Sequence, residues 1–169
     1  IYSMAKDFGF SGIELRGLGE GIFSVRAKPF QKESLTKTIE TLKKNRLEIP
    51  CISTGNALCF PDKWETARVE IQEAIDLAQK LGTPYIRVLG DLTAAPAGEV
   101  DDTVVVKALE YLAPIAERAG VTLLVETNGV YTDTARLREL LEQVGSDNVA
   151  ALWDIHHPYR YHGESPEQT

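Results

Sequence analysis

The chain has 169 residues, of which 43% are hydrophobic and 25% are charged, and its formal net charge is −7 at pH 7. This length suits one domain with a substantial core, and the acidic balance argues against nucleic-acid binding because a phosphate backbone would be repelled. The apolar runs fall far short of the roughly 18 residues of a membrane helix, and no basic-then-apolar leader opens the chain, so we expect a cytoplasmic protein without a membrane partner.

The first part of the chain predicts a helix, a short strand and a loop. Apolar residues spaced as on one helix face end before Gly9, and residues 12–16 are typical of a short strand. The glycine-rich loop at 17–21 differs from a dinucleotide-binding fingerprint because Ile22 replaces its third glycine and no helical pattern starts until about Ser34. We therefore exclude a dinucleotide site of that kind.

The middle of the chain alternates strand and helix patterns. Strands are predicted at 47–53 and at 84–89. Between them, Asp62 and Glu65 have the spacing of a capping box, which predicts a helix from Asp62 up to the stop at Gly82.

The last third repeats the alternation. A helix from about Asp102 contains Pro114, which predicts a kink or a lost hydrogen bond. A strand follows at 121–126, Asp133 caps another helix, and the next strand starts at Val149. Alternating strands and helices predict parallel strands joined by crossovers, as in an open doubly wound sheet or a closed (β/α)8 barrel. Because a phosphate-binding glycine loop is missing, we favour the barrel.

Both ends carry incomplete helical patterns. The first helix is already under way at Ile1, whereas Ser165 and Gln168 have the spacing of a capping box, with Pro166 at the first helical position. We therefore expect residues 1–169 to be a single barrel domain that is truncated at both ends.

Polar side chains follow several predicted strands, and the carboxyl ends of parallel strands carry the chemistry in such folds. They are Glu14, Arg16, Ser53, Asn56, Arg87, Asp91, Glu126, Asn128, Asp154, His156 and His157. Glu126 ends an apolar run, where a carboxylate is costly unless it is paired or binds a cation. A solvated acid at the start of a loop is the alternative, but the strand-end position favours a functional role.

Asp154 follows its own apolar run, and its spacing to His157 matches neither a helix cap nor a simple turn. Two carboxylates and an imidazole suit a divalent ion such as Mn²⁺, Mg²⁺, Co²⁺ or Zn²⁺. Neighbouring residues of a strand point in opposite directions, so only one of the two histidines can face the site, and the spacing to Asp154 favours His157 over His156. Arg87 either anchors a substrate anion or only neutralises the acids. Glu14 and Arg160 are further candidates for substrate binding.

Four segments together resemble the sugar phosphate isomerase/epimerase proteins of the xylose-isomerase-like barrel superfamily, in order and over nearly the whole chain. They are residues 12–16, 81–88, 120–127 and 152–158. The resemblance implies a (β/α)8 TIM barrel present as an incomplete piece with about strands two to six. It also implies an isomerase or epimerase that removes a proton next to the carbonyl of a sugar, sugar phosphate or related polyol. A dehydratase of the inosose or dehydroshikimate type is the alternative, and a non-catalytic sugar-binding barrel is an alternative of another class.

The resemblance further implies roles for individual residues. In the family, one divalent ion is held by an acid after strand five and an acid after strand six, which correspond to Glu126 and Asp154. Two further ligands would lie beyond the last residue, so the piece by itself is expected to be inactive. Glu126 would also act as the base, and His157 corresponds to a catalytic residue that contacts substrate.

The chain departs from two patterns of the wider superfamily. Where several ketose epimerases carry another substrate-binding acid, six residues after the first, it has Thr132. Where the three-zinc apurinic-site endonucleases use extra histidines, it has none before His156. The expected partner is therefore a small sugar or polyol and not a nucleic acid. Relatives often pair, which also implies a homo-oligomer.

Overall fold

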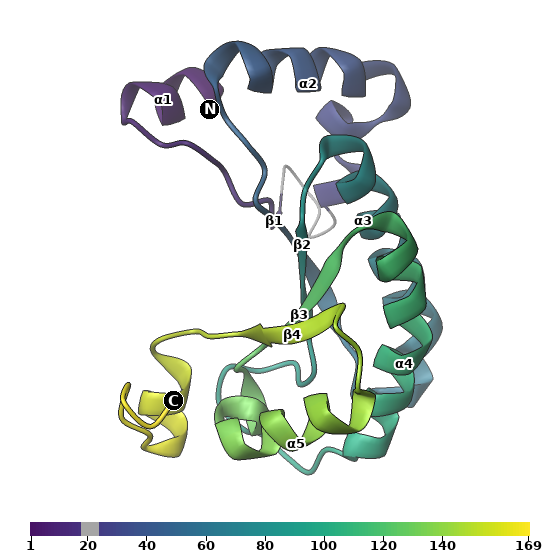
Figure 1. Ribbon diagram of the computed structural model, residues 1–169, viewed down its shortest axis with the longest axis vertical. Coiled ribbons are helices and arrows are strands. Elements are labelled where there is room, and N and C mark those ends of the chain that lie inside the picture. Colours follow the sequence, from purple (N-terminus) through teal and green to yellow (C-terminus); the bar gives the residue numbers. More distant parts are fainter. Residues whose placement is uncertain (18–23) are drawn as a thin grey trace.

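The structure is a computed structural model that describes residues 1–17 and 24–169, so most of the glycine-rich loop predicted at 17–21 lies outside the described residues. In the described residues, four strands form one parallel sheet in chain order, with β1 (Cys51–Ala57) beside β2 (Tyr85–Leu89), then β3 (Thr122–Glu126) and β4 (Val149–Leu152) (Figure 1). The predicted parallel connection of successive strands is therefore present.

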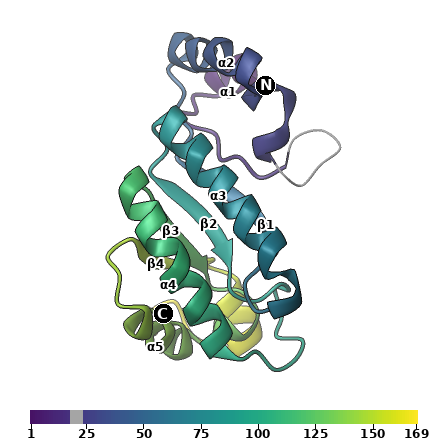
Figure 2. The ribbon, with the colours of Figure 1, turned by 90° about the vertical axis from the view of Figure 1, so that its right-hand side faces the viewer.

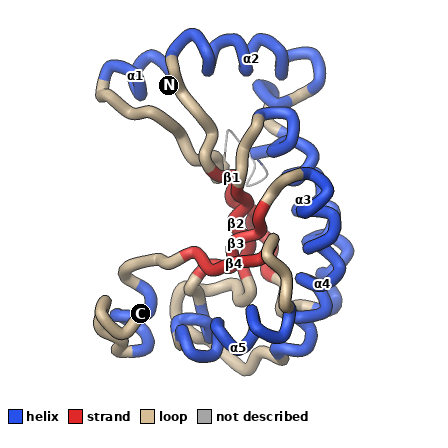
Figure 3. The backbone as a smooth tube through the Cα atoms, viewed as in Figure 1, coloured by secondary structure: helices blue, strands red, loops and turns tan. Residues whose placement is uncertain are grey.

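Helices connect these strands and cover one side of the sheet. The α-helices of the described residues are α1 (Tyr2–Asp7), α2 (Lys32–Asn45), α3 (Trp64–Leu81), α4 (Asp102–Ala119) and α5 (Thr134–Val144). Figure 2 shows α3 and α4 lying side by side in front of the strands, and α5 follows at the end of the row. In Figure 3 the strands stand side by side in the middle of an arc, with these helices on its outer side.

The alternation of side chains along the strands explains this layering. On β2 and β3, the side chains directed at the helices are fully buried: Ile86, Val88, Leu123 and Val125. The opposite face carries Arg87 on β2, and Leu124 and Glu126 on β3, since Arg87 pairs with Leu124 in the register. The helix-covered face is thus the apolar core, and the inner face becomes polar toward the carboxyl ends of the strands.

Two predicted strands differ from the structure. Residues 12–16 make only isolated parallel bridges, Gly12 to Glu48 and Leu15 to Ile52. The strand predicted at 47–53 begins later, at Cys51, because Pro50 has no N–H to donate to the ladder. It also continues further, to Ala57.

The buried carboxylate of Glu70 supports that extension of β1. Its oxygens accept the backbone N–H groups of Gly55 at 2.7 Å and Asn56 at 2.9 Å, at the register shift between Ser53 and Ala57. Helix α3 therefore supplies hydrogen bonds that an even ladder would have supplied.

The predicted helix ends were right in one case and wrong in another. Asp133 caps α5, as predicted, by accepting from the backbone N–H groups at positions 135 and 136. The capping box of Asp62 and Glu65 does not form, because Asp62 lies in a short 3₁₀ turn (Pro61–Lys63) and α3 begins only at Trp64. Glu65 forms an ion pair with Arg68 instead.

Both chain ends show the predicted local patterns. Helix α1 is followed by Gly9 with a positive φ, although Ala5 is its one buried residue. Ser165 and Gln168 exchange the two hydrogen bonds of a capping box, at 2.8 and 3.4 Å.

Pro114 lies inside α4 without ending it. Among the described residues, none of the helices combines the length and the apolar composition needed to cross a lipid bilayer.

Candidate metal centre

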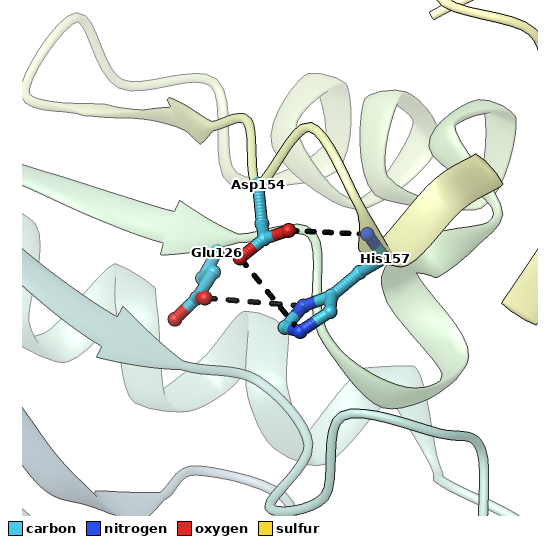
Figure 4. A group of neighbouring side chains, drawn as sticks. All are labelled: Glu126, Asp154 and His157. Atoms are coloured by element: carbon cyan, nitrogen blue, oxygen red, sulfur yellow. Dashed lines mark hydrogen bonds and ion pairs between the residues drawn. The ribbon is translucent and has the colours of Figure 1, made fainter. Parts of the chain in front are cut away.

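Two neighbouring strands bring the acidic candidates together. Glu126 is the last residue of β3 and pairs in register with Leu152, the last residue of β4. Asp154 lies two residues beyond Leu152, and side chains two positions apart on an extended chain share a face. Figure 4 shows the carboxylates of Glu126 and Asp154 on the same side of the sheet, with the imidazole of His157 beside both.

The geometry of this group fits a divalent cation. His157 Nδ1 lies 3.9 Å from Glu126 Oε1, and His157 Nε2 lies 3.7 Å from Asp154 Oδ2. One ligand atom from each side chain lies within 4.8 Å of the other two. Bonds of about 2.1 Å to a central ion place ligand atoms at most about 4.2 Å apart, so small side-chain rotations would bring this set onto one ion.

Arg87 on β2 forms an ion pair with Glu126. Its Nε lies 2.9 Å from Glu126 Oε2, and both side chains are largely buried, at 6% and 13% exposed. Arg87 Nη1 also donates to the carbonyl oxygen of Thr54 at 2.6 Å. Burial lowers the pKa of the Arg87 guanidinium, and the charge of Glu126 partly opposes this effect. Neutralisation of the acid, one of the two predicted roles, is thus visible, and Oε1 is left facing His157.

Asp154 forms a local turn, so the prediction that its spacing to His157 indicates no cap or turn was wrong. Its Oδ1 accepts the backbone N–H groups of His156 at 2.8 Å and His157 at 3.1 Å. This pattern is common for aspartate at a turn because the short carboxylate reaches amides two and three residues on. It occupies Oδ1 and leaves Oδ2 toward His157.

His157, and not His156, contacts the two carboxylates. The predicted reason for this difference does not apply, because β4 ends at Leu152 and the chain is no longer extended at the two histidines. The His156 ring is exposed and packs edge-on to Tyr161, with centroids 6.1 Å apart. The turn at Asp154, and not strand alternation, directs His157 inward.

The two remaining substrate-binding candidates lie outside this group. Glu14 accepts a hydrogen bond of 2.5 Å from Ser53 Oγ, beside β1 and therefore on the far side of β2 from Glu126. Arg160 is exposed in the π-helical turn η5 (Pro158–His162). Among the described residues, the structure shows no contact between its side chain and Glu126, Asp154 or His157.

Sequence reasoning missed Thr127, which directly follows Glu126 and is 2% exposed. It hydrogen-bonds to Asp154 through its hydroxyl and to His157 through its carbonyl oxygen. Its position next to a candidate ligand was the one signal available in the sequence.

A hollow of about 470 Å³ lies between α5 and β4 and is lined by Leu137, Leu141, Ala151 and Trp153 among others. Ala151 and Trp153 alternate with Leu152 and Asp154, so this hollow opens on the helix-covered side of the sheet. It therefore lies on the opposite side from the three candidate ligands.

A protein-family model described as a xylose isomerase-like TIM barrel matches residues 3–169. Hydroxypyruvate isomerase of Escherichia coli K12 is 29% identical over 114 residues, which make up 63% of this chain and 44% of that protein. The chain thus spans less than half the length of this curated relative.

Two solved structures share the fold. A xylose isomerase-like TIM barrel protein from Mycobacterium smegmatis, in complex with magnesium, is 18% identical with a TM-score of 0.71, covering 98% of this chain and 58% of that one. A probable 3-DHS dehydratase, AsbF, from Bacillus anthracis is 21% identical with a TM-score of 0.71, covering 92% of this chain and 57% of that one. The predicted fold, an incomplete TIM barrel, is confirmed.

Proposed function

Because the chain belongs to the xylose isomerase-like TIM barrel family, we propose that it forms part of a divalent-metal-dependent isomerase or epimerase acting on a sugar, a sugar phosphate or a related polyol. The observation that carries this proposal is the convergence of Glu126, Asp154 and His157 at the carboxyl ends of two neighbouring parallel strands. The likeness to a hydroxypyruvate isomerase supports the isomerase reaction.

Glu126 and Asp154 would hold one divalent ion, Mn²⁺, Mg²⁺, Co²⁺ or Zn²⁺, through the oxygens that the other contacts leave free. These are Glu126 Oε1 and Asp154 Oδ2, since Arg87 occupies Oε2 and two backbone amides occupy Oδ1. When bound, such an ion supplies a Lewis acid that polarises a carbonyl oxygen of the substrate. The magnesium complex of the Mycobacterium smegmatis protein supports the choice of a divalent cation.

The chain's own side chains would then move and hold the proton. We assign Glu126, in addition to its role as a ligand, as the base that takes the proton next to the carbonyl, because it lies beside His157 and is held by Arg87. His157 contacts the substrate through Nε2, since its Nδ1 is engaged by the carbonyl of Thr127 at 3.1 Å. Arg87, Glu14 and Arg160 stay predictions as outer substrate contacts.

A dehydratase is the second candidate function, and the residue at position 132 is the observation that favours it. Thr132 takes the place of the acid, is fully buried and donates its hydroxyl hydrogen to the carbonyl of Gly129 at 2.8 Å. The chain therefore lacks, at this position, the extra acid of several ketose epimerases. The fold shared with a probable 3-DHS dehydratase is consistent with this alternative.

Substitution of Glu126 tests the proposal. In the full-length protein, we expect Glu126→Gln to lower both the metal content, measured by mass spectrometry of the purified protein, and the turnover of ketoses, inososes or dehydroshikimate with Mn²⁺ or Co²⁺. Glu142→Gln is the matched control, because Glu142 is exposed on α5 and its side chain lies 3.8 Å from Arg138, away from the candidate site. Normal metal content and turnover in Glu126→Gln would remove this residue from the site.

The non-catalytic alternative gives a different result in the same experiment. A sugar-binding barrel would bind one of these compounds without turnover and need not retain a metal ion.

A cytoplasmic location and pairing into a homo-oligomer rest on composition and resemblance and stay predictions.

A further inference from the structure

Thr127 hydrogen-bonds to two of the three candidate ligands at once. Its Oγ1 accepts the backbone N–H of Asp154 at 2.8 Å and lies 3.4 Å from the carbonyl oxygen of the same residue, to which it donates. Its own carbonyl oxygen faces His157 Nδ1 at 3.1 Å. The residue that follows Glu126 in the chain therefore links the ends of β3 and β4.

The hydroxyl of Thr127 replaces a missing ladder bond. The last ladder-type bond between these strands runs from the N–H of Thr127 to the carbonyl of Leu152 at 2.9 Å. Beyond it, the strands no longer pair, and the N–H of Asp154 takes the threonine hydroxyl as its acceptor. A valine of the same shape would fill the space equally well but could not accept this hydrogen bond.

The carbonyl of Thr127 fixes the proton on the histidine ring. A carbonyl oxygen only accepts, so the hydrogen bond requires that His157 Nδ1 carries the hydrogen. In the neutral ring, the other nitrogen, Nε2, then keeps its lone pair, and it lies on the side of Asp154 Oδ2. Backbone carbonyls commonly set the tautomer and the ring orientation of metal-site histidines in this way.

The residues that follow Thr127 are held from the side of β2. Asn128 Nδ2 donates to the carbonyl of Asp91 at 2.9 Å, and the N–H of Val130 donates to Asp91 Oδ2 at 3.0 Å. Asp91 is 7% exposed and is the second residue after β2. Thr127 therefore bonds directly to the end of β4, and the residues just after it are held by the loop after β2.

We propose that Thr127 is a positioning residue that sets the placement of Asp154 and His157 and thereby the affinity of the site for a divalent ion. This inference rests on the proposed function, because it assumes that these side chains are ligands or contact the substrate. The backbone of Asp154 is held through the hydroxyl and the ring of His157 through the carbonyl.

The test compares three variants of the full-length protein by calorimetric titration with MnCl₂. Thr127→Val should weaken Mn²⁺ binding about tenfold or more, as loss of an outer-shell partner does in other metal sites. Thr127→Ser keeps the hydroxyl and should restore most of the affinity. Thr83→Val is the matched control, because Thr83 Oγ1 is buried and makes no hydrogen bond within the described residues. It should bind Mn²⁺ as the unchanged protein does. Equal affinity of Thr127→Val and the unchanged protein would overturn the role of Thr127.

A second measurement needs no variant. The ¹⁵N resonances of the neutral His157 ring in the metal-free, unchanged protein should show Nδ1 protonated, and a ring protonated at Nε2 would overturn the positioning role. Failure of the unchanged protein to bind Mn²⁺ would instead overturn the proposed function. In that case the tautomer of His157 still decides whether Thr127 holds the ring.

Discussion

We predict that a residue with a side chain in place of Gly129, the third residue after Glu126, destabilises the folded protein. Its φ is +58°, and a Cβ built on its backbone would lie 2.0 Å from Asp91 Oδ2. Gly145 at the end of α5 is a matched control, because its φ is +59° and its Cβ would meet only the carbonyl of Glu142 at 3.7 Å. Both positions have a left-handed backbone that disfavours a side chain, but only at Gly129, of these two, would the new Cβ collide with Asp91.

The magnitudes follow from this difference. Alanine at Gly145 should cost about 1 kcal/mol, the penalty of a left-handed conformation for a residue with a Cβ. Alanine at Gly129 adds the displacement of Asp91, which would leave the N–H of Val130 without its acceptor, at about 1–3 kcal/mol. The total of about 3 kcal/mol corresponds to a midpoint lowered by roughly 6–12 °C in a protein of this size.

The assay is thermal unfolding followed by circular dichroism, with urea unfolding as a check on the free energy. A third variant, Gly129→Ala with Asp91→Ala, removes the carboxylate that the new methyl would meet. Its cost should be smaller than the sum of the two single costs, because the collision is absent from the double variant and the hydrogen bond lost by the N–H of Val130 is counted once instead of twice. If Gly129→Ala lowered stability no more than Gly145→Ala, the close contact with Asp91 would not exist and this reasoning would be refuted.

Two further predictions concern titratable groups. Burial, followed by the charge of Glu14, raises the pKa of the Cys51 thiol to about 11, so iodoacetamide at pH 8 should alkylate it at least tenfold more slowly in the native than in the unfolded protein. Mass spectrometry of the Cys51 peptide checks this, and equal rates would contradict it. Burial alone would raise the pKa of Glu164, but hydrogen bonds from the N–H and hydroxyl of Thr134 lower it overall. The resulting stability is fully present above the usual value of 4.5 and is lost as pH falls through the lower folded-state value. The protection factor of the Thr134 amide, which is its intrinsic exchange rate at each pH divided by the observed rate, should therefore fall on acidification. Glu164→Gln should lack that acid-dependent fall, and the same pH dependence of protection in both proteins would argue against it.

Much of the fold followed from patterns that depend on neighbouring residues alone. The apolar run before Glu126 and the aspartate cap at Asp133 were enough to locate β3 and α5, because burial and capping are read directly from residue type. The capping box at Asp62 was wrong because Pro61 starts a 3₁₀ turn that takes Asp62 with it. The extension of β1 to Ala57 depends on Glu70, a residue of the next helix, so no local pattern could indicate it.

The candidate site, like the fold, could be predicted from the sequence only in part. Glu126 and Asp154 could be predicted to meet because parallel strands end at the same edge of a sheet. The inward direction of His157 could be named but not explained, since it depends on a turn that Asp154 makes with its own following amides. The contact of Thr127 with both residues depends on where the β3–β4 ladder stops, which is set by three-dimensional pairing and not by any spacing.

The placement of Glu126 and Asp154 on adjacent strands has a mechanical consequence. In the described residues, β4 is the last strand of the sheet and pairs only with β3. A cation shared by these two carboxylates would fasten that outermost strand to its neighbour. Since a ligand that binds only the folded state stabilises it by mass action, occupancy of the centre and attachment of the strand would reinforce each other.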